Sequence, residues 1–188
     1  MRRLLFTAIT LLLSANAAAL ELESILERAM VTPPARVGFQ EERHNALFEE
    51  PLRLTGYLEY LEDGELRKVI ETPFAEAFHV RSDHVEIERD GETQVLPIRK
   101  SRSLKVMLGG IEAILAGDTE RIGKVFVHEL SGTESDWSMR LTPRSKRVAR
   151  QLTALTVTGG GDAVTGIRFD LGNGEWHQME LLPDPTEQ

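Results

Sequence analysis

The sequence predicts an α+β domain: one large curved antiparallel sheet of about ten strands, an incomplete β-barrel wrapped around a central helix. Three observations predict this. Residues 103–117 (SLKVMLGGIEAILAG) carry apolar side chains at the 3.6-residue period of an amphipathic helix. Most other stretches alternate apolar and polar residues, as strands with one covered face do. Turn dipeptides such as Asp63-Gly64 and Asp90-Gly91 separate them closely enough for hairpins.

The first nineteen residues are typical of a secretory signal peptide. Arg2 and Arg3 form a basic start, residues 4–13 form a short apolar run, and A-x-A cleavage sites end at Ala17 and Ala19. We therefore expect cleavage after Ala17 or Ala19. The absence of Cys leaves no residue for a lipid anchor. We expect export to the bacterial periplasm.

The remaining length indicates one domain over residues 20–182, followed by a frayed polar tail at 183–188. The net charge of −8 makes binding to nucleic acid or to an anionic lipid surface a poor prediction. Without Cys the fold has no disulfides and must be held by packing. We expect a monomer.

The N-terminal half begins with a helix and continues as strands. Leu22, Ile25, Leu26, Ala29 and Met30 have helical spacing, and the prolines at 33 and 34 end this helix, which we expect to cover the mouth of the sheet as a lid. Strands are then predicted at 36–45, 52–61, 65–71, 74–80, 84–89 and 93–98.

The C-terminal half starts with the central helix. Ser103 is expected to cap its start and Gly117 to end it in the left-handed conformation, while Gly109 and Gly110 allow close packing on a strand or a bend. A short helix at 119–124 follows. Strands are predicted at 125–131, 137–142, 153–159, 163–171 and 175–182, with a type I′ turn at Asn173-Gly174 joining the last two.

The sequence offers little for catalysis. The five His residues have no metal-ligand spacing, and the chain lacks Cys, a G-x-S-x-G nucleophile motif and a P-loop. Glu41 and Glu42 point to opposite faces of a strand and cannot act as a carboxylate pair. We therefore predict no enzyme activity, no cofactor and no metal site.

Apolar side chains on one face of the sheet could line a ligand cavity or fill an ordinary core, and the pattern alone leaves both open. The candidate cavity residues are Leu52, Leu54, Leu58, Tyr60, Phe74, Phe78, Val85 and Ile87 from the strands, with Leu108, Ile111 and Leu115 from the central helix.

Scattered motifs resemble the periplasmic outer-membrane lipoprotein carrier family, the LolA-like proteins, and in particular a divergent LolA-related branch. They include FQEER at 39–43, GYLEY at 56–60, Thr72-Pro73 and WSMRLTP at 137–143, and they span nearly the whole mature chain. The resemblance implies an incomplete barrel with a helical lid. It also implies a cavity that holds the acyl chains of a lipidated cargo and a carrier role toward the outer membrane.

One position departs from the family pattern. The arginine that helps to hold the lid of lipoprotein carriers shut is matched by Glu62-Asp63 here, and Arg67 is the nearest cation that could take its place at the mouth. The cargo could accordingly be a lipoprotein or a free lipid, a glycolipid or a pigment ester, passed from an inner-membrane exporter to an outer-membrane acceptor.

A second reading is a periplasmic sensor or regulatory binding domain on the same scaffold. The connection at 143–151 would then dock a membrane protein through a basic patch formed by Arg144, Lys146, Arg147 and Arg150. A third reading, an enzyme that uses the cavity as its active site, has no nucleophile and base pair to support it.

Overall fold

The computed structural model describes residues 21–182, so the predicted signal peptide and C-terminal tail lie outside the described residues. Eleven antiparallel strands form one open sheet in the order β6-β5-β4-β3-β2-β1-β11-β10-β9-β8-β7. The strands are β1 (Ala35–His44), β2 (Leu52–Tyr60), β3 (Leu66–Thr72), β4 (Glu76–Val80), β5 (His84–Arg89), β6 (Glu92–Pro97), β7 (Phe126–Thr133), β8 (Asp136–Pro143), β9 (Leu152–Gly160), β10 (Ala163–Leu171) and β11 (Trp176–Leu182). This confirms the predicted α+β incomplete barrel.

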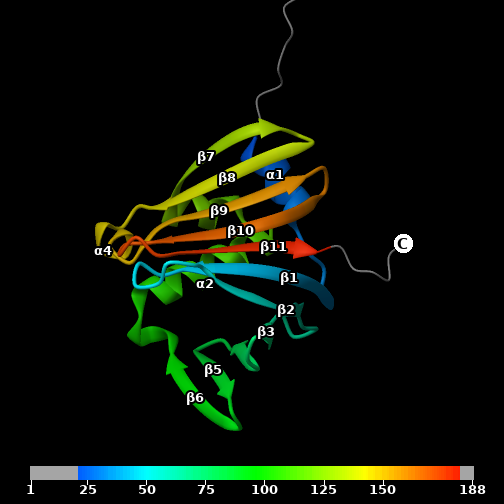
Figure 1. The fold of residues 1–188 in the computed structure, drawn as a ribbon. Helices are drawn as coiled ribbons and strands as arrows, with labels where there is room; N and C mark the ends of the chain where they lie inside the picture. Colours follow the sequence, from blue (N-terminus) through cyan, green and yellow to red (C-terminus); the bar gives the residue numbers. More distant parts are fainter. Residues whose placement is uncertain (1–20, 183–188) are drawn as a thin grey trace, which may run out of the picture.

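Four α-helices accompany the sheet within residues 21–182: α1 (Leu22–Ala29), α2 (Arg102–Leu115), α3 (Thr119–Val125) and α4 (Lys146–Ala149). A short 3-10 helix, η1 (Ile98–Lys100), leads from β6 into α2. Figure 1 shows α1 behind β8, β9 and β10, and the β5–β6 hairpin at the far end of the sheet. The sequence predicted α1, α2 and α3 but took α4 for an irregular connection.

Ser101 and Gly117 set the two ends of α2. The predicted Ser103 cap is wrong, because Ser101 is the N-cap and its hydroxyl accepts a hydrogen bond from the Leu104 amide at 3.3 Å. At the other end Gly117 adopts φ +65°, as predicted, and stops the helix.

Close packing explains one of the two glycines inside α2. A Cβ on Gly110 would lie 3.0 Å from the Phe126 ring and 3.5 Å from Leu155. The helix therefore approaches the sheet so closely at this turn that a larger residue would require the Phe126 ring to shift. Gly109 faces only the flexible end of Arg121.

The hairpin turns match the sequence with one exception. Asp90 and Gly91 both have positive φ, at 53° and 79°. The β10–β11 turn has positive φ only at Gly174, so the predicted type I′ turn is wrong there, since that type needs two such residues. The Asn173 side chain instead accepts a hydrogen bond from the Glu175 amide.

Two separate core clusters divide the sheet. In the larger one Ile25 of α1, Ala113 of α2 and Ile122 of α3 pack against Trp137, Met139 and neighbouring residues of β7 to β10. The smaller one contains Phe39, Leu54, Ile70 and Met179, at the centre of the sheet on β1, β2, β3 and β11. The three longer helices therefore cover mainly one half of one sheet face.

Among residues 21–182 we find no helix with the length and apolar character needed to cross a membrane.

Candidate functional site

We call the face of the sheet on which α1 to α3 pack the helix-side face. Strand register extends this face from the covered half into β1 to β6, because directly paired residues of an antiparallel sheet point to the same side. Met139 of the large core is linked through Val157, Ile167 and Met179 to Glu41. From Glu41 the same face continues through Leu54 and the alternate residues of β2 to β5.

Seven predicted cavity residues lie on the helix-side face of this second half. They are Leu52, Leu54, Leu58 and Tyr60 of β2, Phe78 of β4, and Val85 and Ile87 of β5. Phe74 precedes β4 and packs against the smaller core. Leu54 and Val85 are buried, but Leu58, Tyr60, Phe74, Phe78 and Ile87 are only half-buried and Leu52 is 42 % exposed. The strand register thus places the predicted cavity residues of the strands on one apolar surface that is only partly covered.

Helix α2 presents two apolar stripes. Val106, Gly110, Ala113 and Ile114 pack into the larger core or are buried beside it. At 100° per residue, the predicted cavity residues Leu108, Ile111 and Leu115 point roughly 150° away from that stripe. Ile111 and Leu115 are half-buried and Leu108 is 8 % exposed. This second stripe lies outside the larger core, and of its side chains only Ile111 and Leu115 are partly exposed.

Two small cavities lie near the start of α2. One, of about 170 Å³, is lined mainly by Leu104, Met107, Leu152 and Leu171, and the other, of about 140 Å³, by polar residues that include Lys100 and Arg147. None of the predicted cavity residues lines either of them. Both are below the size of usual ligand pockets, about 300–1,000 Å³. These two cavities are therefore too small for an acyl chain, and the predicted lipid cavity stays a prediction.

A charged group lies in the middle of this apolar surface. The Lys68 ammonium lies 2.5 Å from one carboxylate oxygen of Glu41, and the Arg43 guanidinium donates to both oxygens at 3.1 and 3.3 Å. His177 Nδ1 of β11 lies 3.8 Å from the same carboxylate. The Glu41 side chain is 2 % exposed, whereas those of Lys68 and Arg43 keep 20 % and 23 %. We call Glu41, Arg43, Lys68 and His177 the inner charged cluster.

Sequence reasoning missed the inner charged cluster, although part of the signal was present. Lys68 occupies an inward position between Leu66 and Ile70, so a period-2 reading of β3 would have marked it as a cation inside the barrel. The pairing of β1 with β11, which brings His177 to Arg43, joins distant parts of the chain and left no local pattern.

The electrostatics of the inner charged cluster follow from burial and mutual attraction. Burial alone would raise the pKa of the Glu41 carboxyl, but Lys68 and Arg43 outweigh it and hold the pKa below its usual 4.5. Burial lowers the pKa of the Lys68 ammonium in spite of Glu41. Burial, then the Arg43 charge, lowers the pKa of His177 below 6.5, so His177 is neutral at pH 7.

These shifts predict a pH dependence of folding stability. His177 binds a proton less readily in the folded state than in the unfolded state. Its contribution to the free energy of unfolding is therefore present above pH 6.5 and is lost as the pH falls through the lowered pKa. Half-buried His84 has a pKa raised by Asp83 and Glu86 and acts in the opposite direction. The measurement is therefore the difference between wild type and His177→Gln in urea unfolding from pH 7.5 to 5, where the variant is expected to lose less stability. Parallel curves would contradict this assignment.

The structure places Arg67 on the opposite face of the sheet. Its guanidinium lies 3.4 Å from Glu59, which also pairs with Arg36. Arg67 therefore points away from the helices, and its neighbour Lys68 is the cation that reaches the helix-side face.

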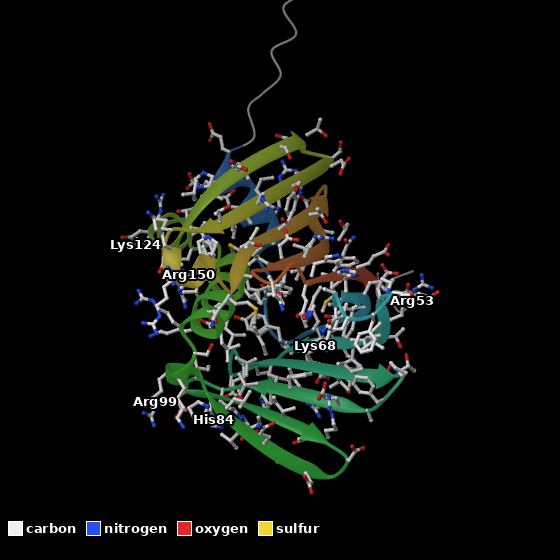
Figure 2. All side chains as sticks on the ribbon, turned by 60° about the vertical axis from the view of Figure 1, so that its left-hand side comes forward. Arg53, Lys68, His84, Arg99, Lys124 and Arg150 are labelled. Atoms are coloured by element: carbon white, nitrogen blue, oxygen red, sulfur yellow. The ribbon has the colours of Figure 1, made fainter. Side chains whose placement is uncertain are left out.

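The predicted docking patch is exposed. Arg144, Lys146, Arg147 and Arg150 surround α4, and Arg144 donates to the Gly123 carbonyl at 2.9 Å. Within the described residues no carboxylate lies within 4 Å of these four cations. Figure 2 shows Arg150, Arg99 and Lys124 along the same side of the molecule and Lys68 near its middle. The patch is therefore separate from the inner charged cluster.

No group of three or more metal-ligating side chains is found among residues 21–182.

Comparisons with known proteins give one match along the sequence. A family model described as outer membrane lipoprotein carrier protein LolA-like matches residues 14–183. No curated protein matches the chain.

Several solved structures have a similar arrangement at low identity. A LolA superfamily protein from Nitrosomonas europaea is 10% identical with a TM-score of 0.45, covering 88% of this chain and 93% of that one. Lipoprotein LppX from Mycobacterium tuberculosis is 10% identical with a TM-score of 0.45, covering 86% and 91%. The Pseudomonas aeruginosa MucA/MucB complex gives 11% identity and a TM-score of 0.39, covering 88% and 58%.

Proposed function

Because the chain belongs to the LolA-like family of outer membrane lipoprotein carrier proteins, we propose that it is a periplasmic carrier of acylated cargo. It binds the acyl chains of a lipoprotein, or of another lipid-like molecule, on the helix-side face of β1 to β6 and on the second stripe of α2. It then moves the cargo toward the outer membrane. The proposed signal peptide at residues 1–19 supplies its export.

The partly uncovered apolar surface carries this proposal. Leu58, Phe78 and Ile87 lie in one cross-strand row of this face, with Lys68 of β3 between Leu58 and Phe78. All three apolar side chains remain half-buried where the longer helices do not cover them. A filled core would bury such side chains completely. An apolar chain laid over them would complete their burial.

The energy available suits a carrier. Each CH₂ removed from water contributes about 0.8 kcal/mol, so a sixteen-carbon chain offers roughly 12 kcal/mol before the entropic cost of binding. An acyl chain that binds only along an open surface leaves part of its own surface in water and gains much less than this free energy. The weaker binding permits release to an acceptor. Binding of this kind needs no catalytic group.

The exposed basic patch of Arg144, Lys146, Arg147 and Arg150 supports a second candidate. In a chain with a net charge of −8, four exposed cations around one short helix favour contact with an acidic surface of another protein. In a carrier this partner would be the donor or acceptor of the cargo. In a periplasmic sensor or regulatory domain it would be a membrane signalling protein, and no cargo would be needed.

Native mass spectrometry of the protein purified from the periplasm tests the carrier proposal. We expect the wild type to hold an acyl-containing species that organic solvent extracts. Leu58→Glu and Phe78→Glu place a charge on the apolar surface and are expected to abolish this cargo while the fold survives, because both positions are half-buried and their new carboxylates can reach water.

Val95→Glu is the matched control. Val95 is 53% exposed on β6 and, paired with Glu86, points to the opposite face of the same half of the sheet. It should leave the cargo in place. Unchanged cargo in folded Leu58→Glu and Phe78→Glu would contradict the carrier proposal, and a wild type without any bound species would favour the sensor.

A further inference from the structure

The inner charged cluster has more positive than negative charge facing the apolar surface. Within residues 21–182, Glu41 is the only carboxylate within 4 Å of Lys68 or Arg43, and both cations share it. The next acid on this face, Glu76, is held by Arg89 at 2.5 Å. His177 adds no charge at pH 7. Two cations and one anion leave a net charge of about +1 in a partly desolvated position.

The two cations also have hydrogen-bonding capacity to spare. An ammonium has three N–H donors and a guanidinium has five. Lys68 donates to one oxygen of Glu41, and Arg43 uses its Nε and Nη2 groups on the same carboxylate. Both side chains remain about one-fifth exposed. Donors therefore remain for a further acceptor on the open side.

Apolar groups surround these donors. The Lys68 ammonium lies 4.8 Å from the centre of the Phe39 ring, and Lys68 is paired across the sheet with Leu58 on one side and Phe78 on the other. A ligand that satisfies the donors must also lie against aromatic and aliphatic side chains. This combination fits an amphiphile with one anionic end.

We propose that Lys68 and Arg43 bind the anionic headgroup, a carboxylate or a phosphate, of an acyl-chain ligand whose tail lies over Leu58 and Phe78. This rests on the proposed carrier function and adds the chemical class of the cargo. Glu41 holds the two cations in place from beneath. The headgroup approaches from the side away from the Glu41 carboxylate, since the two negative charges repel each other.

Calorimetric titration of the delipidated protein tests the headgroup assignment. The probes are myristate, myristyl alcohol and lysophosphatidylglycerol with a fourteen-carbon chain. The wild type is expected to bind the two anionic probes about ten- to a hundredfold more tightly than the alcohol, the ratio that charge-assisted hydrogen bonds provide. The better of the two anions identifies a carboxylate or a phosphate as the preferred headgroup.

Lys68→Met should remove most of that preference without changing binding of the alcohol, and Lys68→Arg should retain it. Arg43 still pairs with Glu41 in both variants, so the fold is expected to persist, as circular dichroism can verify. Arg67→Met is the matched control, because it removes one positive charge from the adjacent residue on the opposite face. It should bind all probes as the wild type does.

The outcomes separate the two proposals. Equal affinity for acid and alcohol, or an unchanged preference in Lys68→Met, would overturn the headgroup assignment and leave the carrier function standing. Failure of the wild type to bind any of the three probes would overturn the carrier function together with it.

Discussion

Glu41→Leu is expected to lower the free energy of unfolding by about 3 kcal/mol, the lower end of the range for breaking a buried ion pair. The substitution leaves Lys68 and Arg43 on the helix-side face with no carboxylate within 4 Å among the described residues. The lower end applies because both cations keep about one-fifth of their side-chain exposure and can regain some water. Urea unfolding at pH 7 measures the loss.

A double variant separates charge from packing. Glu41→Met combined with Lys68→Met replaces the pair with apolar side chains of similar volume and leaves Arg43 to reach water. It should recover part of the stability lost in Glu41→Leu. If the double variant is no more stable than Glu41→Leu, the unpaired ammonium is not the cause of the loss.

Trp137→Ala is expected to cost about 3–5 kcal/mol, the range for emptying an aromatic site in a packed core. Trp137 is 1% exposed, packs within the larger core cluster, and its indole nitrogen donates to the Gly161 carbonyl at 3.4 Å. The ring lies against Gly159 of the neighbouring strand, where an added Cβ would come within 2.1 Å of it. Thermal unfolding followed by circular dichroism measures the effect.

Trp176→Ala provides the comparison, since the chain has only two tryptophans. Trp176 is half-buried, stacks on His44 with ring centres 5.5 Å apart, and carries the Arg168 guanidinium over its face. Its removal should cost clearly less than that of Trp137. Similar losses at the two sites would contradict the view that the complete burial of Trp137 makes it the more stabilising of the two.

The fold could be predicted largely because its signals are local. Alternation along β2 and β5 identified strands, and Asp90-Gly91 identified the turn between β5 and β6, since each depends on neighbouring residues. The cap of α2 was misplaced by two residues because Ser101 and Ser103 offer the same hydroxyl, and only the backbone decides which one caps.

The candidate site was predicted only in part, because its chemistry depends on long-range register. The apolar members of β2, β4 and β5 were found by alternation. The partners of Glu41 come from β1, β3 and β11, and no spacing in the sequence brings Lys68 and His177 together. The two stripes of α2 were read as one, because a periodicity shows which residues are apolar and not what covers them.

The pairing of β1 with β11 also affects how the chain can fold. These two strands join the halves of the sheet, and their paired residues Phe39 and Leu181 are about 140 positions apart. Closing so long a loop costs conformational entropy before the hydrogen bonds between β1 and β11 can form and offset it. Such a cost is typical of slow-folding topologies with high contact order. Each half can begin to fold by itself, but the sheet is complete only when residues 176–182 arrive. Until β11 pairs with β1, no strand pairing joins the two halves of the sheet.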